Sequence, residues 1–203
     1  MTEPGPLLTV RDLALSRGER LLFEGIGFEL GAGGLLLVRG PNGAGKSSLL
    51  LTLAGILRPE RGSIAWAGRE ERVPIHVVGH LPGVKSRLTL AENLQFWRQV
   101  NGQNGLPADA ALDAVGLGGL DEIEAGHLSA GQTRRLGLTR LLVTDRRIWL
   151  LDEPTASLDT AGEALVGRLI AARLKTGGAV IAATHHDIAA GVVPQTLTLG
   201  AAA

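Results

Sequence analysis

Residues 37–55 read LVRGPNGAGKSSLLLTLAG and fall into three parts. The first ends an apolar run, GLLLVRG (34–40), whose length is typical of a strand buried on both faces. The last carries leucines at helical spacing and predicts a helix that ends before Pro59. Between them lie small residues and one lysine. Such a stretch is either a turn that reverses the chain or a loop shaped to bind phosphate groups.

The small residues fit the phosphate-binding pattern G-x-x-x-x-G-K-[ST]. The matching stretch, with the serine that follows it, is Gly40, Pro41, Asn42, Gly43, Ala44, Gly45, Lys46, Ser47 and Ser48. Backbone N–H groups of such a loop converge on the phosphates, while Lys46 reaches the β and γ phosphates and Ser47 ligates Mg²⁺. A chance match in a chain with 29 glycines is the alternative. The strand before the loop and the helix after it favour phosphate binding.

Composition narrows the classes of protein and partner. The 203 residues are 45% apolar, enough for the core of one domain. Twenty basic and twenty acidic side chains balance without a run of like charge, so we expect no nucleic-acid partner. The absence of cysteine excludes disulfides and thiolate chemistry. The N-terminus, MTEPGPLLTVRD, does not resemble a secretory signal, and no apolar run is long enough to span a membrane.

Strand and helix patterns alternate along most of the chain, which predicts an α/β fold with a mainly parallel sheet. At the N-terminus, LLTVRDLALS (7–16) and RLLFEGIGFEL (20–30) predict an antiparallel pair. GSIAWAG (62–68) and PIHVVG (74–79) follow as short strands. Thr89 and Glu92 then have capping-box spacing within a helical stretch. We expect a single domain, 1–203, with a nucleotide-binding core (1–80 and 128–203) and an inserted helical lobe (about 82–127).

The second half of the core predicts helices over 129–143 and 160–175, and strands in RRIWLLDEP (146–154), GAVIAATHHD (178–187) and QTLTLG (195–200). The first of these strands carries Asp152 to the edge of the sheet beside the phosphate loop, where it would hold Mg²⁺. Glu153 is then placed to act as the general base on an attacking water. For an isolated Asp-Glu pair, capping of the next loop is the simpler interpretation, and the phosphate loop favours catalysis.

The segment LSAGQ (128–132) opens a predicted helix, and Ser129 with Gln132 has capping-box spacing, so a capped helix is its simplest interpretation. Four segments in order suggest more: GPNGAGKSS (40–48), LSAGQ, WLLDEPTASLD (149–159) and THHD (184–187). Through them nearly the whole chain resembles the ATP-binding cassette (ABC) ATPases. The resemblance implies a P-loop NTPase fold of ABC type, ATP and Mg²⁺ as cofactors, and ATP hydrolysis.

The resemblance also implies a second copy of the chain, closed head to tail with the first around ATP. Ser129, Gly131 and Gln132 of one copy would bind the nucleotide held by the other, with the helix N-terminus as an anion clamp. Asp159 would communicate across the same interface. His185 would contact the γ-phosphate and the water, with His186 as the adjacent alternative.

Two positions depart from the family pattern. An aromatic residue usually stacks on the adenine in the turn between the first two strands, where this chain has Arg17; a planar guanidinium can also stack. A glutamine usually senses Mg²⁺ and water where this chain has Leu81, which ligates nothing. The resemblance therefore says least about the timing of hydrolysis, because Leu81 lacks the polar group of the usual glutamine.

Within the family, GHLPGVK (79–85) resembles the haem-export ATPases of cytochrome c maturation. That resemblance implies integral membrane subunits of the same system as partners and a peripheral position on the cytoplasmic face of the inner membrane. The alternatives are the ATPase of another small exporter and a regulatory ATP-binding module that hydrolyses little. Phe96 and Trp97 either help to dock a membrane subunit or pack in the core of the lobe.

Overall fold

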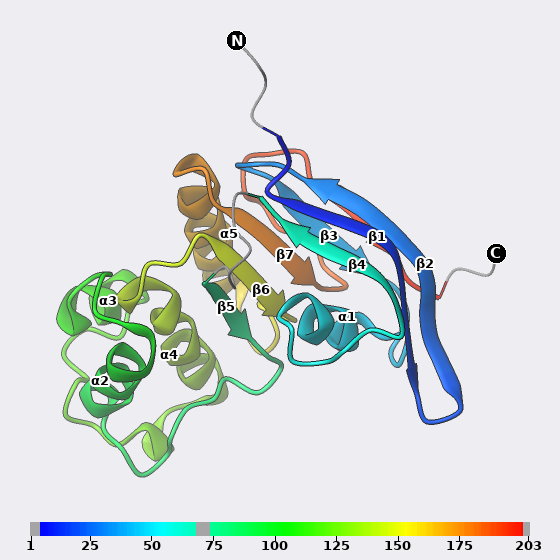
Figure 1. The fold of residues 1–203 in the computed structure, drawn as a ribbon. Helices are drawn as coiled ribbons and strands as arrows, with labels where there is room; N and C mark the ends of the chain where they lie inside the picture. Colours follow the sequence, from blue (N-terminus) through cyan, green and yellow to red (C-terminus); the bar gives the residue numbers. More distant parts are fainter. Residues whose placement is uncertain (1–4, 68–73, 201–203) are drawn as a thin grey trace.

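Two sheets form the framework of the protein, a computed structural model of which describes residues 5–67 and 74–200 (Figure 1). An antiparallel sheet has the order β2-β1-β4. A parallel sheet has the order β5-β6-β7-β3-β8. The strands are β1 (Leu8–Arg17), β2 (Arg20–Leu30), β3 (Leu35–Arg39), β4 (Arg61–Trp66), β5 (Ile75–Val78), β6 (Ile148–Asp152), β7 (Ala179–Ala183) and β8 (Gln195–Thr198). The α/β fold with a mainly parallel sheet and an N-terminal antiparallel pair is confirmed.

The helices of the described residues are α1 (Lys46–Leu53), α2 (Leu90–Asn101), α3 (Ala108–Ala114), α4 (Ala130–Val143) and α5 (Thr160–Lys175), with a 3₁₀ turn at Ala125–His127. The capping boxes predicted at the starts of α2 and α4 are both present. Two parts of the sequence interpretation, residues 1–4 of the N-terminus and the last residue of GSIAWAG, lie outside the described residues. Within 5–67 and 74–200, no helix combines the length and apolar character needed to cross a bilayer.

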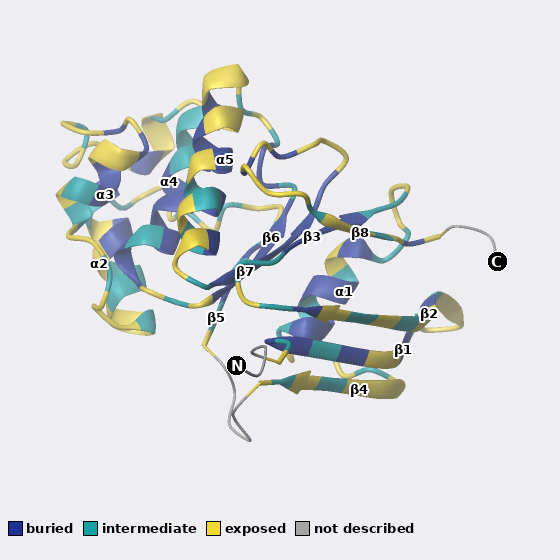
Figure 2. Ribbon diagram, turned by 90° about the horizontal axis from the view of Figure 1, so that it is seen from above, coloured by how far each residue is buried: buried dark blue, intermediate teal, exposed yellow. Residues whose placement is uncertain are grey.

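Successive side chains along each strand of the parallel sheet point to opposite faces of the sheet, and both faces are buried. Leu36 and Val38 of β3 face α1, which packs between the two sheets with Leu49, Leu50 and Leu53. Side chains on the opposite face pack against α4 and α5. Figure 2 shows the central strands as the most buried part of the molecule. This arrangement explains why GLLLVRG is apolar without alternation.

The helices between β5 and β6 lie to one side of the sheet (Figure 1). Their core joins α2 and α3 to α4 through Leu94, Leu112, Leu136 and Val143. Helix α4 also sends Leu138 and Leu141 into the core beneath the sheet. Trp97 packs against the lobe core. The ring of Phe96 contacts the ring of Trp97 edge to face, with ring centroids 5.5 Å apart. Helix α4 therefore belongs to the lobe and to the sheet layer at once.

Candidate active site

Three loops meet at the carboxyl edge of the parallel sheet. Strands β6, β7 and β3 are neighbours and run in the same direction, so the loops that follow them emerge side by side. The loop after β3 is the phosphate loop (40–48), the one after β6 carries Glu153, and the one after β7 carries His185. Asn42 and His185, 143 positions apart in sequence, are thereby brought together.

The phosphate loop leaves the N-terminus of α1 open. Gly45 is the N-cap residue, with φ of 95°, and no side chain caps this end of the helix. The first N–H groups of α1 are therefore available to an anion. At Gly40, where φ is 135°, an added Cβ would meet the Leu199 carbonyl oxygen at 2.4 Å. The loop thus needs glycine at its first position and has the form of an anion cradle.

Lys46 is held over the loop that precedes it. Its Nζ donates hydrogen bonds to the carbonyl oxygens of Gly40 at 2.7 Å and Pro41 at 3.2 Å. The side chain is buried, and Nζ also lies 3.0 Å from Nε2 of His185. The ammonium group is therefore already at the end of the cradle where the terminal phosphates of a nucleotide would bind.

His185 connects the three loops through a single ring nitrogen. Nε2 lies 3.1 Å from Oδ1 of Asn42 and 3.6 Å from Oε1 of Glu153. An unprotonated Nε2 accepts a hydrogen bond from Lys46, whereas a protonated Nε2 donates to an oxygen of Asn42 or Glu153. Which of these contacts is a hydrogen bond therefore depends on the tautomer of the ring. His186, whose backbone N–H donates to Thr184 Oγ1 at 3.0 Å, is exposed and makes no side-chain contact that connects the loops.

The phosphate loop and the turn after β6 border a cleft of about 530 Å³, whereas His185 is not among the residues that line it. Asp152 and Glu153 line it together with Ser47 and other residues of the phosphate loop, and Arg17 lines it from the end of β1. The hydroxyl of Ser47 and the carboxylate of Asp152 are hard oxygen donors of the kind Mg²⁺ prefers. In the part of the chain that the structure describes, no group of three or more acidic, histidine or cysteine side chains is placed to hold a metal. The donor set fits an ion completed by phosphate and water.

Three cleft residues were missed by sequence reasoning: Arg20, Leu22 and His80. Arg20 donates to the carbonyl oxygen of Gly43 at 3.5 Å. It pairs with Arg17 across the turn between β1 and β2, and this closeness in sequence to a predicted site residue could have indicated it. His80 directly precedes Leu81, whose side chain is 79% exposed and does not line the cleft. No sequence pattern indicated that His80, and not Leu81, lines the cleft.

The residues of the LSAGQ segment lie elsewhere. Ser129 accepts from the N–H of Gln132 at 3.2 Å, and Gln132 Oε1 accepts from the N–H of Ser129 at 2.9 Å. Asp159 caps α5 by accepting from the N–H of Gly162 at 2.8 Å. None of these residues, nor Gly131, lines the cleft of their own chain. Each has a local role at a helix start and an exposed or partly exposed position.

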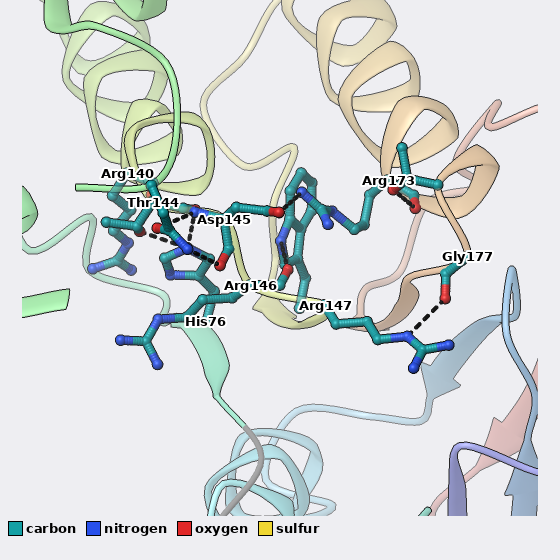
Figure 3. A network of polar contacts seen from close by, with 11 residues as sticks. His76, Arg140, Thr144, Asp145, Arg146, Arg147, Arg173 and Gly177 are labelled. Carbon is teal, nitrogen blue, oxygen red and sulfur yellow. Dashed lines mark hydrogen bonds and ion pairs between the residues drawn. The ribbon is translucent and has the colours of Figure 1, made fainter. Parts of the chain in front are cut away.

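A second polar cluster lies at the other end of the sheet, before β5, β6 and β7 (Figure 3). Burial, reinforced by the nearby positive charges of Arg146, Arg140 and Arg173, lowers the pKa of His76 to about 4, against the opposing effect of its hydrogen bond to Thr144. Burial also lowers the pKa of Arg140 to about 10, and its guanidinium lies 4.8 Å from the ring centroid of Trp97. His76 and Arg140 are buried and do not line the cleft at the carboxyl edge.

Comparison with known proteins agrees with this geometry. Residues 23–156 match the family described as ABC transporter. The chain is 46% identical over 200 residues to the cytochrome c biogenesis ATP-binding export protein CcmA of Rhodopseudomonas palustris, covering 97% of this chain and 99% of that one. It is 50% identical over 182 residues to the protein of the same name from Paracoccus denitrificans, covering 90% and 84%.

Among solved structures, a putative ABC transporter ATP-binding protein from Pyrococcus furiosus superimposes with a TM-score of 0.81 at 25% identity, covering 95% of this chain and 96% of that one. An ATP-binding subunit of an ABC transporter gives a TM-score of 0.83 at 22% identity, covering 95% and 85%, and supports the fold alone. The chain belongs to the ABC transporter family, as an ATP-binding subunit with ATPase activity.

Proposed function

We propose that this chain hydrolyses Mg-ATP to power the export step of cytochrome c biogenesis, with haem as the cargo. The observation that carries the hydrolytic part is the meeting of Lys46, Glu153 and His185 beside an uncapped helix N-terminus. The cargo is supported by the resemblance to proteins named for cytochrome c biogenesis export.

The phosphate chain of ATP binds to the N–H groups of the phosphate loop. Lys46 exchanges its loop carbonyls for the β and γ phosphates and neutralises the charge that develops there. Glu153 orients and deprotonates the attacking water, and His185 contacts the γ-phosphate while holding a proton at Nε2. Arg17, on the cleft wall, is the candidate to stack on the base.

Ser47 and Asp152 are the residues proposed to hold Mg²⁺. The bound ion would neutralise phosphate charge. Asp152 is buried at the end of β6, so its carboxylate is fixed by the sheet, whereas Ser47 is fixed by the first turn of α1. One carboxylate and one hydroxyl leave room for the phosphate and water ligands that Mg²⁺ retains.

Ser129, Gly131, Gln132 and Asp159 are proposed to act on the ATP of a second copy. They are outside the cleft of their own chain, and the LSAGQ segment opens α4, whose N-terminus carries a partial positive charge that suits an anion. Two copies closed head to tail would place each segment over the other's phosphate loop. The integral membrane subunits of the cytochrome c maturation system are the proposed partners, at the cytoplasmic face of the inner membrane.

The test is complementation in a bacterial strain that lacks its own ATPase for cytochrome c maturation. The wild-type chain should restore covalently haem-bound c-type cytochromes on a haem-stained gel and should co-purify with the membrane subunits. The Lys46→Ala chain should co-purify without restoring them. Restoration of a different export process, with no effect on c-type cytochromes, would contradict the cargo and leave the ATPase assignment intact.

A further inference from the structure

The guanidinium of Arg134 lies in the second turn of α4, just after the LSAGQ segment, and is 3% exposed. Nε donates to the carbonyl oxygen of Pro154 at 3.3 Å. Nη1 donates to those of Gly79 at 3.1 Å and His80 at 3.0 Å. Nη2 donates to those of Asp152, at 2.8 Å, and Glu153. An arginine has five N–H donors, so the whole donor set is used.

The five acceptors belong to two turns that are far apart in sequence. One turn follows β5 and leads into the helical lobe, and it carries His80 to the cleft wall. The other follows β6 and carries the two carboxylates. Because every acceptor is a backbone carbonyl, Arg134 fixes the main chain of both turns. A planar fork with donors at fixed angles is suited to this task, and a lysine ammonium is not.

The backbone of Glu153 needs such support. Its φ is 46°, in the left-handed region that residues with a side chain seldom adopt. A residue held there costs on the order of 1–3 kcal/mol and persists only where its surroundings over-determine it. Here the N–H of Glu153 donates to Ala183 at 2.8 Å, and its carbonyl accepts from Ala156 at 3.0 Å and from Arg134. The left-handed turn directs the Glu153 side chain toward the cleft.

The charge balance around Arg134 is consistent with a fixed cation. Burial lowers the pKa of Arg134, and the negative charges of Asp152 and Glu153 raise it. The neighbouring Arg135 is different: its Nη1 reaches the Val115 carbonyl of the lobe at 3.4 Å and contacts neither turn. The same helix thus offers two arginines, of which one connects to the active site.

We propose that Arg134 is a positioning residue for hydrolysis: it locks the left-handed turn of Glu153 to the turn of His80, so that both side chains face the phosphate end of the cleft. Since Arg134 lies one turn from Ser129, the same lock makes the LSAGQ helix move with the hydrolytic carboxylate of its own chain. The proposal rests on the proposed role of Glu153 as general base.

The test compares Arg134→Lys with Arg135→Lys in the purified full chain. The two positions are adjacent on one helix, and each substitution keeps the positive charge at its position. In Arg134→Lys we expect kcat for ATP hydrolysis to fall about tenfold with KM changed less than twofold. A misplaced base stabilises the transition state less well but leaves ATP binding unchanged. Arg135→Lys should match the wild type in both parameters. Thermal unfolding of both variants reports any loss of folding.

A double variant tests whether Arg134 acts through the carboxylate. Adding Arg134→Lys to Glu153→Gln should not lower the residual rate further. If Arg134 acts only through Glu153, the effects of the two substitutions are not additive. An additive tenfold loss would overturn the proposal, as would wild-type kcat in Arg134→Lys. Wild-type turnover in Glu153→Gln would instead refute the base assignment itself. Arg134→Gln serves as a second variant, and unfolding of both Arg134 variants would show a folding role and also overturn the proposal.

Discussion

The two edges of the parallel sheet carry polar clusters of opposite character. At the carboxyl edge, Lys46 and Glu153 line a cleft, and both contact the same ring nitrogen of His185, at 3.0 and 3.6 Å. At the amino edge, Arg173 donates to Asp145 at 2.6 Å and Arg147 donates to Gly177 at 3.1 Å, in a network that connects the ends of α4 and α5 to the strands (Figure 3).

The difference shows that a perturbed pKa alone does not identify a functional site. His76 has its pKa lowered to about 4, but its Nε2–H is shared between the carbonyl and hydroxyl oxygens of Thr144, at 2.9 Å each. The Thr144 hydroxyl in turn donates to the backbone carbonyl oxygen of Arg140. That arrangement is complete without a ligand. The carboxyl edge has a helix N-terminus without a side-chain cap and free space beside it, so a bound anion could complete it.

The largest expected effect is at the carboxyl edge. Lys46→Ala should abolish ATP hydrolysis, because it removes the charge that stabilises the leaving phosphoryl group, a contact worth several kcal/mol in a site shielded from water. The exposed Lys175→Ala at the end of α5 is the matched control and should keep wild-type turnover. Steady-state phosphate release measures both. A folded Lys46→Ala protein with wild-type turnover would contradict the assignment of this edge.

At the amino edge we expect an effect on stability. The folded-state pKa of His76, about 4, lies below its unfolded value of 6.5, so between these values the unfolded chain binds a proton that the folded chain does not. Stability from this group is therefore complete above pH 6.5 and is lost as the pH falls to 4, by about 3 kcal/mol at most. Denaturant unfolding of wild type and His76→Gln across this range isolates the contribution. Parallel curves for the two proteins would refute it.

The smallest effect separates two residues that are adjacent in sequence, His80 on the cleft wall and Leu81 outside it. His80→Ala should slow turnover several-fold, because an imidazole that lines the cleft is lost. Leu81→Ala should leave hydrolysis by the purified chain within about twofold of wild type, because exposed side chains away from the site have small effects. Leu81→Gln should likewise change little in the absence of membrane subunits. A greater loss at Leu81 than at His80 would reverse this interpretation.

Much of the carboxyl edge could be predicted from local sequence. The phosphate loop has a fixed spacing between a strand and a helix, and the strand periods predict that β3 and β6 end at the same edge. Capping boxes at α2 and α4 are likewise local and were correctly predicted. Such features depend on residues within a few positions of one another.

The contacts of Arg134, Arg20 and His80 could not be predicted in this way. Arg134 reaches carbonyl oxygens as many as 55 positions away, and a backbone acceptor leaves no mark on the identity of its residue. The double role of α4, shared between lobe and sheet, also depends on three-dimensional packing. The clusters at the amino edge combine arginines from separate helices and loops, and the sequence shows them only as scattered charges.

The central claim is that Glu153 activates the attacking water at the carboxyl edge, and Glu153→Gln tests it most directly. The amide keeps the shape of the side chain but accepts no proton, so turnover should fall at least tens-fold while Mg-ATP binding persists. ATP should then accumulate in closed dimers, seen by light scattering as an ATP-dependent shift that Ser129→Arg abolishes. Wild-type turnover by a folded Glu153→Gln protein would contradict the claim.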